Sequence, residues 1–432
     1  MPASSRETVR IAVLADSDTR WKWGALTARR ITAGDVEPTG FVLRGRATPT
    51  ARQLAETGAA AAAPREVTGA EFLRAVRDAE VRGERYDVIV LALVGGTVRA
   101  VLQGLADLGL DRRPVIVTGY VGVVYEKLAD GLLLRHGADV VLANSRHDAD
   151  RFRAVYEGVG AGAESVVEAA LPFLGGAPYR PEPGRDTLVF AAQPSVPTTR
   201  AERAYVLERL VRHARLHPGR EVLLKLRSKP GEHTTHLEEH PYQKLVRGLE
   251  PPANLRLVYG HMGEVLDRTD LLVTVSSTAA LESLHRRIPT AVLTDCGVRE
   301  AHGNHHFLGS GLLTSFDRLD RGEVPVPDEA WLARQGVAAG AGEGSYDAAF
   351  DAARARVADL LARPGLPPIA PYYTAETAGG YLPGILARHR LDVTAPPARD
   401  SGLRRIVREA ARGAYRHGVQ RVAPVVRRLG EL

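Results

Sequence analysis

The sequence contains almost no cysteine and no long apolar run. Its 432 residues include one cysteine, Cys296, so no disulfide can form within the chain, and a reducing cytosol fits this composition. A single cysteine also excludes zinc ribbons and other cysteine-rich metal sites. The first apolar run, residues 11–15, ends at Asp16, and no stretch reaches the roughly 20 apolar residues of a membrane span. We therefore expect a cytoplasmic protein without a signal peptide or a membrane-spanning helix.

The composition is that of an ordinary globular protein with more than one domain. Hydrophobic residues make up 44% of the chain and charged residues 25%, and the formal net charge is a modest +6. The length favours two or three domains, each able to bury its own core. Arginine greatly outnumbers lysine, which indicates a GC-rich bacterial genome rather than a function. Because lysines are few, it is notable that three of them lie close together in the sequence: Lys225, Lys229 and Lys244.

Apolar strands alternate with helical patterns in two series. The first series has strands at residues 9–16, 40–44, 86–94, 114–119 and 138–144, and the second at 187–192, 221–227, 254–259, 271–275 and 290–294. Strands separated by helices predict parallel sheets. Clustered proline and glycine between the series indicate a linker. We therefore predict an α/β fold with two lobes and a deep cleft between them: residues 1–175, a linker at 176–186, residues 187–345, and C-terminal helices at 346–432.

The most informative segment is the polar turn Ser276-Ser277-Thr278. It falls where an apolar strand ends and a helix begins. In open parallel sheets, ligands bind at the carboxyl ends of the strands. A helix that begins there directs free N–H groups and a positive dipole end at the ligand, which suits a phosphate. The alternative is an ordinary helix cap made by serine and threonine.

Three other strand-end segments of the second lobe carry polar side chains. Lys225 and Arg227 alternate on one strand end and suit a diphosphate or a carboxylate, although simple solvent exposure is the alternative. Glu282 lies one helical turn after the Ser-Ser-Thr turn, where it can accept hydrogen bonds from ribose hydroxyls or, alternatively, pair with Arg286 on the surface. The remaining candidate donor-site residues also follow strands: Gln193, His236, Tyr259, His261 and Met262.

In the first lobe, acidic, basic and aromatic residues concentrate after the first strand. Asp16 and Asp18 are the candidate bases that deprotonate an acceptor hydroxyl, and the tryptophans can stack on a sugar. The alternative is a capping aspartate with buried tryptophans. Two glycine-containing turns follow later strands, and neither contains the G-x-G-x-x-G fingerprint of dinucleotide sites. The candidate acceptor-site residues are Arg20, Trp21, Trp23, Gly95, Gly96 and Tyr120.

The second lobe resembles a known group of enzymes. A strand, a helix and then DLLVTVSSTAALESLHRRIPT, over roughly residues 187–300, resembles the nucleotide-binding lobe of GT-B glycosyltransferases, and the double serine resembles bacterial sialyltransferases, polysialyltransferases and capsule-building enzymes. Those families have a basic or His-Pro motif upstream of the serine motif. His240-Pro241 has the residues of the His-Pro motif, but it lies farther from its strand than the family pattern places that motif. We therefore assign Lys225, Arg227 and His236 as the equivalent group.

This resemblance implies a function. It implies two Rossmann-like lobes and transfer of a sugar from a CMP- or UDP-linked donor to a saccharide, lipid-linked or natural-product acceptor, with inversion. We expect no cofactor beyond the nucleotide-sugar substrate and no metal, although Asp16-Ser17-Asp18 has D-x-D spacing. The alternatives are a nucleotide-sugar 2-epimerase of the same fold and a non-catalytic membrane-surface scaffold with a degenerate nucleotide site.

A basic segment ends the chain. Residues 403–428 contain eight arginines, one acid and a partial apolar face, a pattern typical of a peripheral helix on anionic lipid. The alternative is a helix that packs on the lobes with its arginines in solvent. The segment is poor in aromatic residues and no recognition module accompanies it, so we do not expect nucleic-acid binding.

Overall fold

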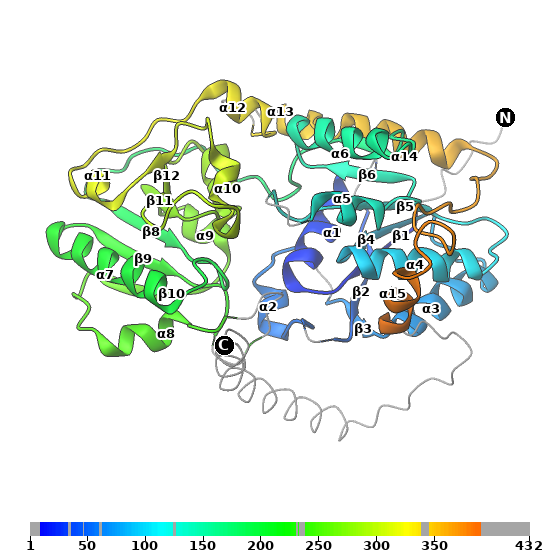
Figure 1. Cartoon of the computed structure of the whole chain (residues 1–432), viewed down its shortest axis with the longest axis horizontal. Helices are drawn as coiled ribbons and strands as arrows, with labels where there is room; N and C mark the ends of the chain where they lie inside the picture. Colours follow the sequence, from blue (N-terminus) through cyan, green and yellow to red (C-terminus); the bar gives the residue numbers. More distant parts are fainter. Residues whose placement is uncertain are drawn as a thin grey trace, which may run out of the picture. The chain divides into compact units, whose positions relative to one another are not determined.

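The computed structural model describes residues 9–32, 36–45, 47–59, 63–123, 127–229, 232, 238–337 and 345–389 (Figure 1). The chain divides into two compact units. Among the described residues, the first unit contains those up to Leu174 and those from Leu332 onward, and the second contains Gly175–Trp331. The sequence placed residues 332–345 with the second lobe, whereas the described residues of this stretch, 332–337 and 345, group with the first unit. The helix α12 (Glu329–Arg334) contains this boundary.

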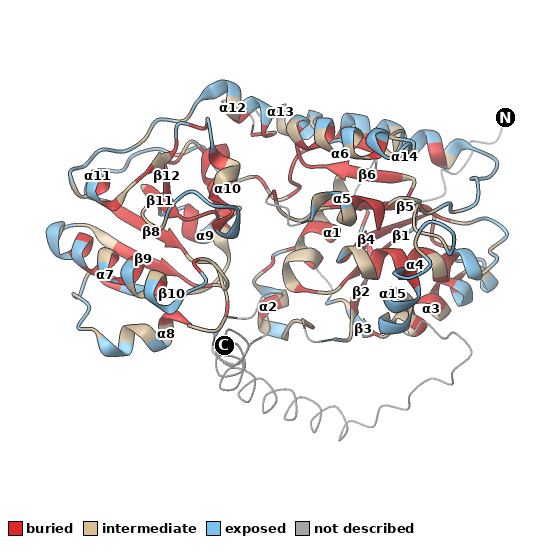
Figure 2. Ribbon diagram, viewed as in Figure 1, coloured by how far each residue is buried: buried red, intermediate tan, exposed pale blue. Residues whose placement is uncertain are grey.

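The first unit is built on a seven-stranded parallel sheet in the order β3-β2-β1-β4-β5-β6-β7. Its central strands are buried at every position, because helices cover both faces of such a sheet (Figure 2). The strands are β1 (Ile11–Ala15), β2 (Thr39–Leu43), β3 (Arg65–Val67), β4 (Val88–Ala92), β5 (Val115–Gly119), β6 (Val140–Ala143) and β7 (Val166–Glu168). The helices are α1 (Asp18–Arg30), α2 (Ala51–Ala55), α3 (Gly69–Val81), α4 (Gly95–Asp107), α5 (Leu128–Leu133), α6 (Arg146–Gly158), α13 (Ser345–Ala348), α14 (Asp351–Ala362) and α15 (Leu382–His389).

The second unit is built on a six-stranded parallel sheet in the order β10-β9-β8-β11-β12-β13. Its strands are β8 (Thr187–Ala191), β9 (Glu221–Lys225), β10 (Leu255–Val258), β11 (Leu271–Thr274), β12 (Thr290–Leu293) and β13 (Leu313–Thr314). Its helices are α7 (Arg200–Leu216), α8 (Tyr242–Leu245), α9 (Met262–Leu266), α10 (Ala279–His285) and α11 (Phe316–Asp320), with short 3-10 turns η1 (Val246–Gly248), η2 (Glu300–His302) and η3 (Asn304–Phe307).

The two parallel sheets confirm the predicted α/β class with two Rossmann-like lobes. All ten predicted strands are present. The sequence missed β3, β7 and β13, which are two or three residues long and lie at sheet edges. Edge strands of this length bury little apolar surface, so they leave almost no hydrophobic pattern.

Strand order fixes where each unit can bind a ligand. In the first unit the chain builds β1, β2 and β3 toward one edge and then returns to place β4 on the other side of β1. The second unit repeats this arrangement with β8, β9, β10 and then β11. Loops that leave neighbouring strands in opposite directions open a crevice at the strands' carboxyl ends, the usual ligand site of such sheets. The relevant loops follow β1 and β4 in one unit, and β8 and β11 in the other.

Two predicted features lie outside the described residues: His236 and the basic segment 403–428. In the part of the chain that is described, no helix is both long enough and apolar enough to cross a membrane.

Candidate functional site

In the second unit, a hydrogen-bonded link joins the loops after β8 and β11. The side-chain oxygen of Gln193 accepts hydrogen bonds from the Ser276 N–H and hydroxyl, both at 3.1 Å. Thr274, fully buried at the end of β11, donates its hydroxyl to the Ala191 carbonyl at 2.9 Å and accepts from the Ser277 N–H at 3.1 Å. The predicted donor-site residues Gln193 and Ser276 are therefore together at the carboxyl ends of β8 and β11.

The three residues of the Ser-Ser-Thr turn differ in their surroundings. Ser276 is buried, and its hydroxyl contacts the His302 carbonyl as well as Gln193, so it supports the turn from inside. Ser277 and Thr278 are half-buried. The Ser277 hydroxyl accepts from the Ala279 N–H at 3.2 Å. Within the described residues, no hydrogen bond engages the Thr278 N–H or hydroxyl, which leaves them as donors for a ligand.

Glu282 lies on the first turn of α10 and is only 8% exposed. The alternative prediction, a surface glutamate paired with Arg286, is wrong. Arg286 is itself buried and directs its guanidinium at the Gly175 carbonyl (2.6 Å), the Gly263 carbonyl (3.1 Å) and Asp267 (2.5 Å). All seven residues of α10 are buried, because the helix packs into the unit rather than over its surface. Glu282 stays a candidate ribose ligand, because its carboxylate lies on the first helical turn after the Ser-Ser-Thr segment.

The predicted pair of cations after β9 is only partly exposed. Lys225 is the last residue of β9 and is 6% exposed, and its ammonium donates to the Leu226 carbonyl at 2.8 Å. Arg227 follows the end of the strand and is half-buried, so strand alternation does not fix its direction. The strand ends at Lys225, two residues before the predicted end, so strand geometry no longer supports the prediction that both side chains share one face, and that placement stays a prediction.

The loop after β10 holds the other predicted donor-site residues. The Tyr259 hydroxyl accepts from the Gln243 side chain at 3.1 Å, and the same amide donates to the Ser228 carbonyl at 2.9 Å. His261 is the N-cap of α9, and Met262 begins that helix. Tyr259, His261 and Met262 are all half-buried. They lie after β10, two strands away from the β8/β11 crevice in the sheet order.

Sequence reasoning missed the loop after β12. His302 is 1% exposed, and its Nε2 lies 3.3 Å from a carboxylate oxygen of Glu202. Glu202 also contacts Arg299 and closes the capping box of α7 with Thr199. Burial raises the pKa of Glu202, but the bonds from Thr199 and Arg299 outweigh it and leave that pKa lowered. This loop directly follows the predicted strand at residues 290–294, and that position could have identified it from the sequence.

Cys296 belongs to the same loop. It is half-buried, and burial together with the nearby Glu202 and Asp295 carboxylates raises the pKa of its thiol to about 11. Arg299 acts in the opposite direction, but the thiol pKa stays raised, so the side chain is a neutral thiol at neutral pH rather than an activated nucleophile.

In the first unit, Asp16 joins the loops after β1 and β4. One carboxylate oxygen accepts from the Arg20 guanidinium at 2.8 Å, and the other accepts from the Val94 N–H at 3.1 Å. Ser17 caps α1, so Asp18 is the first helical residue rather than the cap. Gly95 and Gly96 form the first turn of α4, whose cap residue Val94 supplies no side-chain bond. Both oxygens of Asp16 are thus committed to holding this crevice in shape.

Trp21 and Trp23 require a correction. They are 2% and 0% exposed and belong to the apolar core beneath the sheet. A Cβ built on Gly119 would lie 2.8 Å from the Trp23 ring, which shows that the ring lies directly against β5. The prediction that these rings stack on a sugar is wrong, because neither ring has an open face, and the alternative of buried tryptophans holds.

Tyr120, at the end of β5, is half-buried beneath a charged group. The Arg135 guanidinium lies 4.0 Å from the centre of its ring. Arg135 is 4% exposed and donates to the carbonyls of Gly119 (3.1 Å), Gly131 (2.7 Å) and Leu93 (3.1 Å). Burial lowers the pKa of Arg135 and raises that of Tyr120. The tyrosine therefore stays protonated at neutral pH at the rim of the first unit's strand ends.

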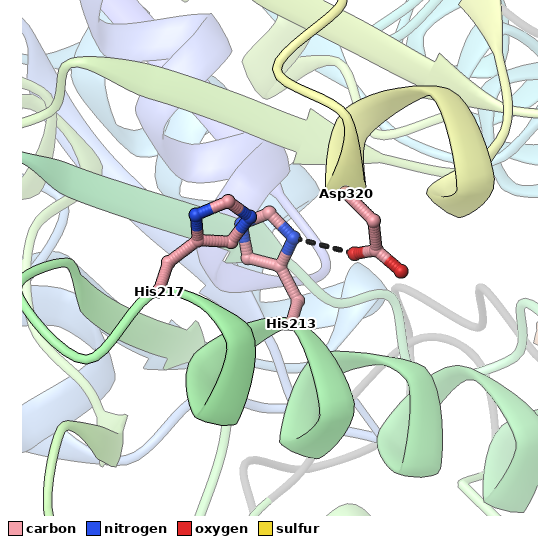
Figure 3. Close-up of side chains that lie close together, drawn as sticks. All are labelled: His213, His217 and Asp320. Carbon is pink, nitrogen blue, oxygen red and sulfur yellow. Dashed lines mark hydrogen bonds and ion pairs between the residues drawn. The ribbon is translucent and has the colours of Figure 1, made fainter.

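One cluster among the described residues has the side chains of a metal site: His213, His217 and Asp320 (Figure 3). His213 Nδ1 bonds to one Asp320 oxygen at 2.8 Å, and its Nε2 lies 3.1 Å from the Arg220 guanidinium. The other Asp320 oxygen accepts from Arg209 at 3.0 Å. A cation would have to displace these guanidinium contacts, so the cluster fits an ion-pair network better than a metal site.

Comparison with curated proteins found no match. Among solved structures, a UDP-N-acetylglucosamine 2-epimerase is 12% identical with a TM-score of 0.50, over 84% of this chain and 98% of that one. The S. aureus MnaA–UDP co-structure is 13% identical with a TM-score of 0.48 (76% and 91% covered), and the glycotransferase of kitacinnamycin is 14% identical with a TM-score of 0.41 (89% and 99% covered). The first of these likenesses supports the predicted GT-B-like fold. A family model matches residues 11–356, and the chain therefore belongs to the family described as "Putative glycosyltransferase (DUF6716)".

Proposed function

We propose that this protein transfers a sugar from a nucleotide-sugar donor, UDP-linked in the first instance, to a hydroxyl acceptor. The observation that carries the proposal is the hydrogen-bonded pair of loops after β8 and β11. There, Gln193 holds the Ser-Ser-Thr turn, Thr278 offers an N–H and a hydroxyl, and Glu282 lies buried one turn further on. The donors suit a diphosphate, and the carboxylate suits the ribose hydroxyls.

The choice of UDP rests on the structural neighbours. The solved structures that resemble this chain include a co-structure with UDP and enzymes that act on UDP-N-acetylglucosamine by their names. CMP-linked donors, which the double serine suggests by its likeness to sialyltransferases, form the second class to test. In either case the first unit provides the acceptor side at the strand ends. Asp16 follows β1, Arg20 is on the first turn of α1, Gly95 and Gly96 begin α4 after β4, and Tyr120 follows β5.

The proposed chemistry is a direct displacement with inversion. The acceptor oxygen forms a bond to the anomeric carbon while the bond from that carbon to the diphosphate oxygen breaks. Helix N–H groups and cations stabilise the charge that develops on the leaving diphosphate. A base in the first unit removes the acceptor proton. No step of this proposal requires a metal.

A panel of nucleotides tests the donor site. We expect UDP to raise the melting temperature more than CMP, GDP and TDP, because a ligand that binds only the native state stabilises it by about 2.7 kcal/mol at a hundredfold excess over Kd. Differential scanning fluorimetry provides the measurement. If none of the four nucleotides shifts the melting temperature, the scaffold alternative gains and the transferase proposal fails.

A second experiment separates transferase from epimerase. The protein is incubated with radiolabelled UDP-N-acetylglucosamine without any acceptor, and the sugars are separated by chromatography. We expect no isomerised sugar, and UDP release that rises when hydroxyl acceptors are added. Formation of the 2-epimer without an acceptor would establish the epimerase alternative.

A further inference from the structure

The C-terminal part of the first unit is hydrogen-bonded to helices α4 and α5. Arg99, 1% exposed on α4, donates to the Tyr373 carbonyl through Nε at 2.9 Å and through a terminal nitrogen at 2.8 Å. The Tyr373 and Tyr381 hydroxyls donate to the two oxygens of Asp130 on α5, at 2.9 and 3.0 Å. These bonds fix the chain on both α4 and α5 directly before α15 begins.

Helix α15 then runs against α4 and ends at His389 (Figure 1). Leu382 and Ile385 are buried on its inner side. Ile385 and His389 are four residues apart and therefore share one face of the helix. A Cβ built on Gly96 would lie 3.8 Å from Ile385 and 3.7 Å from His389 Nε2. The imidazole thus lies over the first turn of α4, where glycine leaves the space open.

Asp16 lies at the same end of α4. Its carboxylate accepts from the Val94 N–H, the cap position of that helix. Burial lowers the pKa of His389, Arg388 on the same helix lowers it further, and the Asp16 carboxylate acts in the opposite direction. The first turn of α4 contributes no charged side chain, but two guanidiniums lie at this end of the helix: Arg20, bonded to Asp16, and Arg135, whose terminal nitrogen lies 3.2 Å from a Cβ built on Gly95. The imidazole is therefore neutral at neutral pH, and it lies with the Asp16 carboxylate at the N-terminal end of α4, the end assigned to the acceptor.

We propose that His389 is the base that removes the acceptor proton, and that Asp16 holds a compensating charge rather than acting as the base. This inference rests on the proposed function. The acceptor oxygen bonds to the anomeric carbon, the carbon–diphosphate bond breaks with its electron pair on the leaving oxygen, and the acceptor proton moves to His389 Nε2. Asp16, whose oxygens already bond Arg20 and Val94, stabilises the resulting imidazolium. Water later takes the proton from the ring.

A histidine titration tests the arrangement without any substrate. NMR spectra of the isotope-labelled protein are recorded against pH, and the His389 signal is identified by its loss in His389→Gln. In Asp16→Asn the titration midpoint of His389 should fall, because the carboxylate that favours the charged ring is gone. A midpoint that does not move would overturn the proposed pairing. The matched control is Ala387→Gln, an exposed position on the same helix, which should leave the midpoint unchanged.

Turnover of UDP-N-acetylglucosamine with an added acceptor tests the role. His389→Gln should lower kcat by at least about a hundredfold, as removal of a general base does, while the shift in melting temperature with UDP persists. In the wild type, kcat should fall as pH drops through the His389 pKa, because the protonated ring cannot accept a proton, and this limb should vanish in His389→Gln. Unchanged kcat in that variant would refute the inference. A wild type without a UDP shift would instead refute the donor proposal, and the histidine titration would still decide the pairing.

Discussion

Replacing Glu282 by glutamine is expected to weaken UDP binding by about tenfold to a hundredfold. The carboxylate is 8% exposed on the first turn of α10, adjacent to the Ser-Ser-Thr turn. A hydrogen bond to a charged group contributes about 1.5–3 kcal/mol, and each 1.4 kcal/mol changes Kd tenfold. Glutamine keeps the shape of the side chain and one acceptor oxygen but loses the charge. Isothermal titration calorimetry with UDP measures the change in Kd.

A control on the same unit separates binding from folding. Glu208→Gln changes an exposed glutamate on α7 and should leave Kd for UDP within twofold of the wild type. The melting temperature of Glu282→Gln without nucleotide should also be compared, since α10 is buried throughout. If Glu282→Gln binds UDP as tightly as Glu208→Gln does, the ribose assignment is wrong.

Replacing Trp23 by alanine is expected to destabilise the first unit by about 3–5 kcal/mol. The side chain is fully buried against β5, and its indole N–H lies 3.4 Å from Asn144 Oδ1. Deleting a buried aromatic ring removes its apolar contacts and leaves a cavity, which gives losses of this size. The free energy of unfolding is measured by circular dichroism in urea, fitted to more than one transition because the chain has two units.

Val81→Ala is the matched control for this substitution. Val81 is 82% exposed at the end of α3, so its loss should change the free energy of unfolding by less than about 0.5 kcal/mol. A ring that served only to stack on a sugar would lie at the surface, and its removal would resemble the control. Equal stability of Trp23→Ala and Val81→Ala would contradict the burial of the tryptophan.

The sequence predicted the fold well because its signals are strong. Each central strand, such as Val88–Ala92, is an apolar run flanked by helical periodicity, and parallel strands buried on both faces leave that pattern. The Ser-Ser-Thr turn and Asp16 were found because the carboxyl end of a strand is a recognisable position. Both lie at the point where their sheet reverses its strand order.

The remaining site residues required the tertiary structure. From the sequence alone, aromatic residues after a strand can equally be ligand contacts or core residues. For Trp23, only its packing against Gly119 in the structure shows that it is a core residue. Lys225 is polar in the sequence, yet the sheet buries it and its ammonium bonds a neighbouring carbonyl. His389 lies more than 370 residues after Asp16, so no local sequence pattern connects them. The hydrogen bond from Arg99 to Tyr373 is what returns this part of the chain to α4.

Hydrogen–deuterium exchange with and without UDP tests the central claim, that the strand-end loops of the second unit hold the nucleotide. Mass spectrometry of peptides across the whole chain locates each protected segment. We predict slower exchange on addition of UDP in peptides that contain the turn at residues 276–278 and the start of α10, together with the loop at residue 193. Peptides of the first unit's α3, which contains none of the proposed site residues, should exchange at the same rate in both states. Protection confined to the first unit, with none at residues 276–281, would contradict the account.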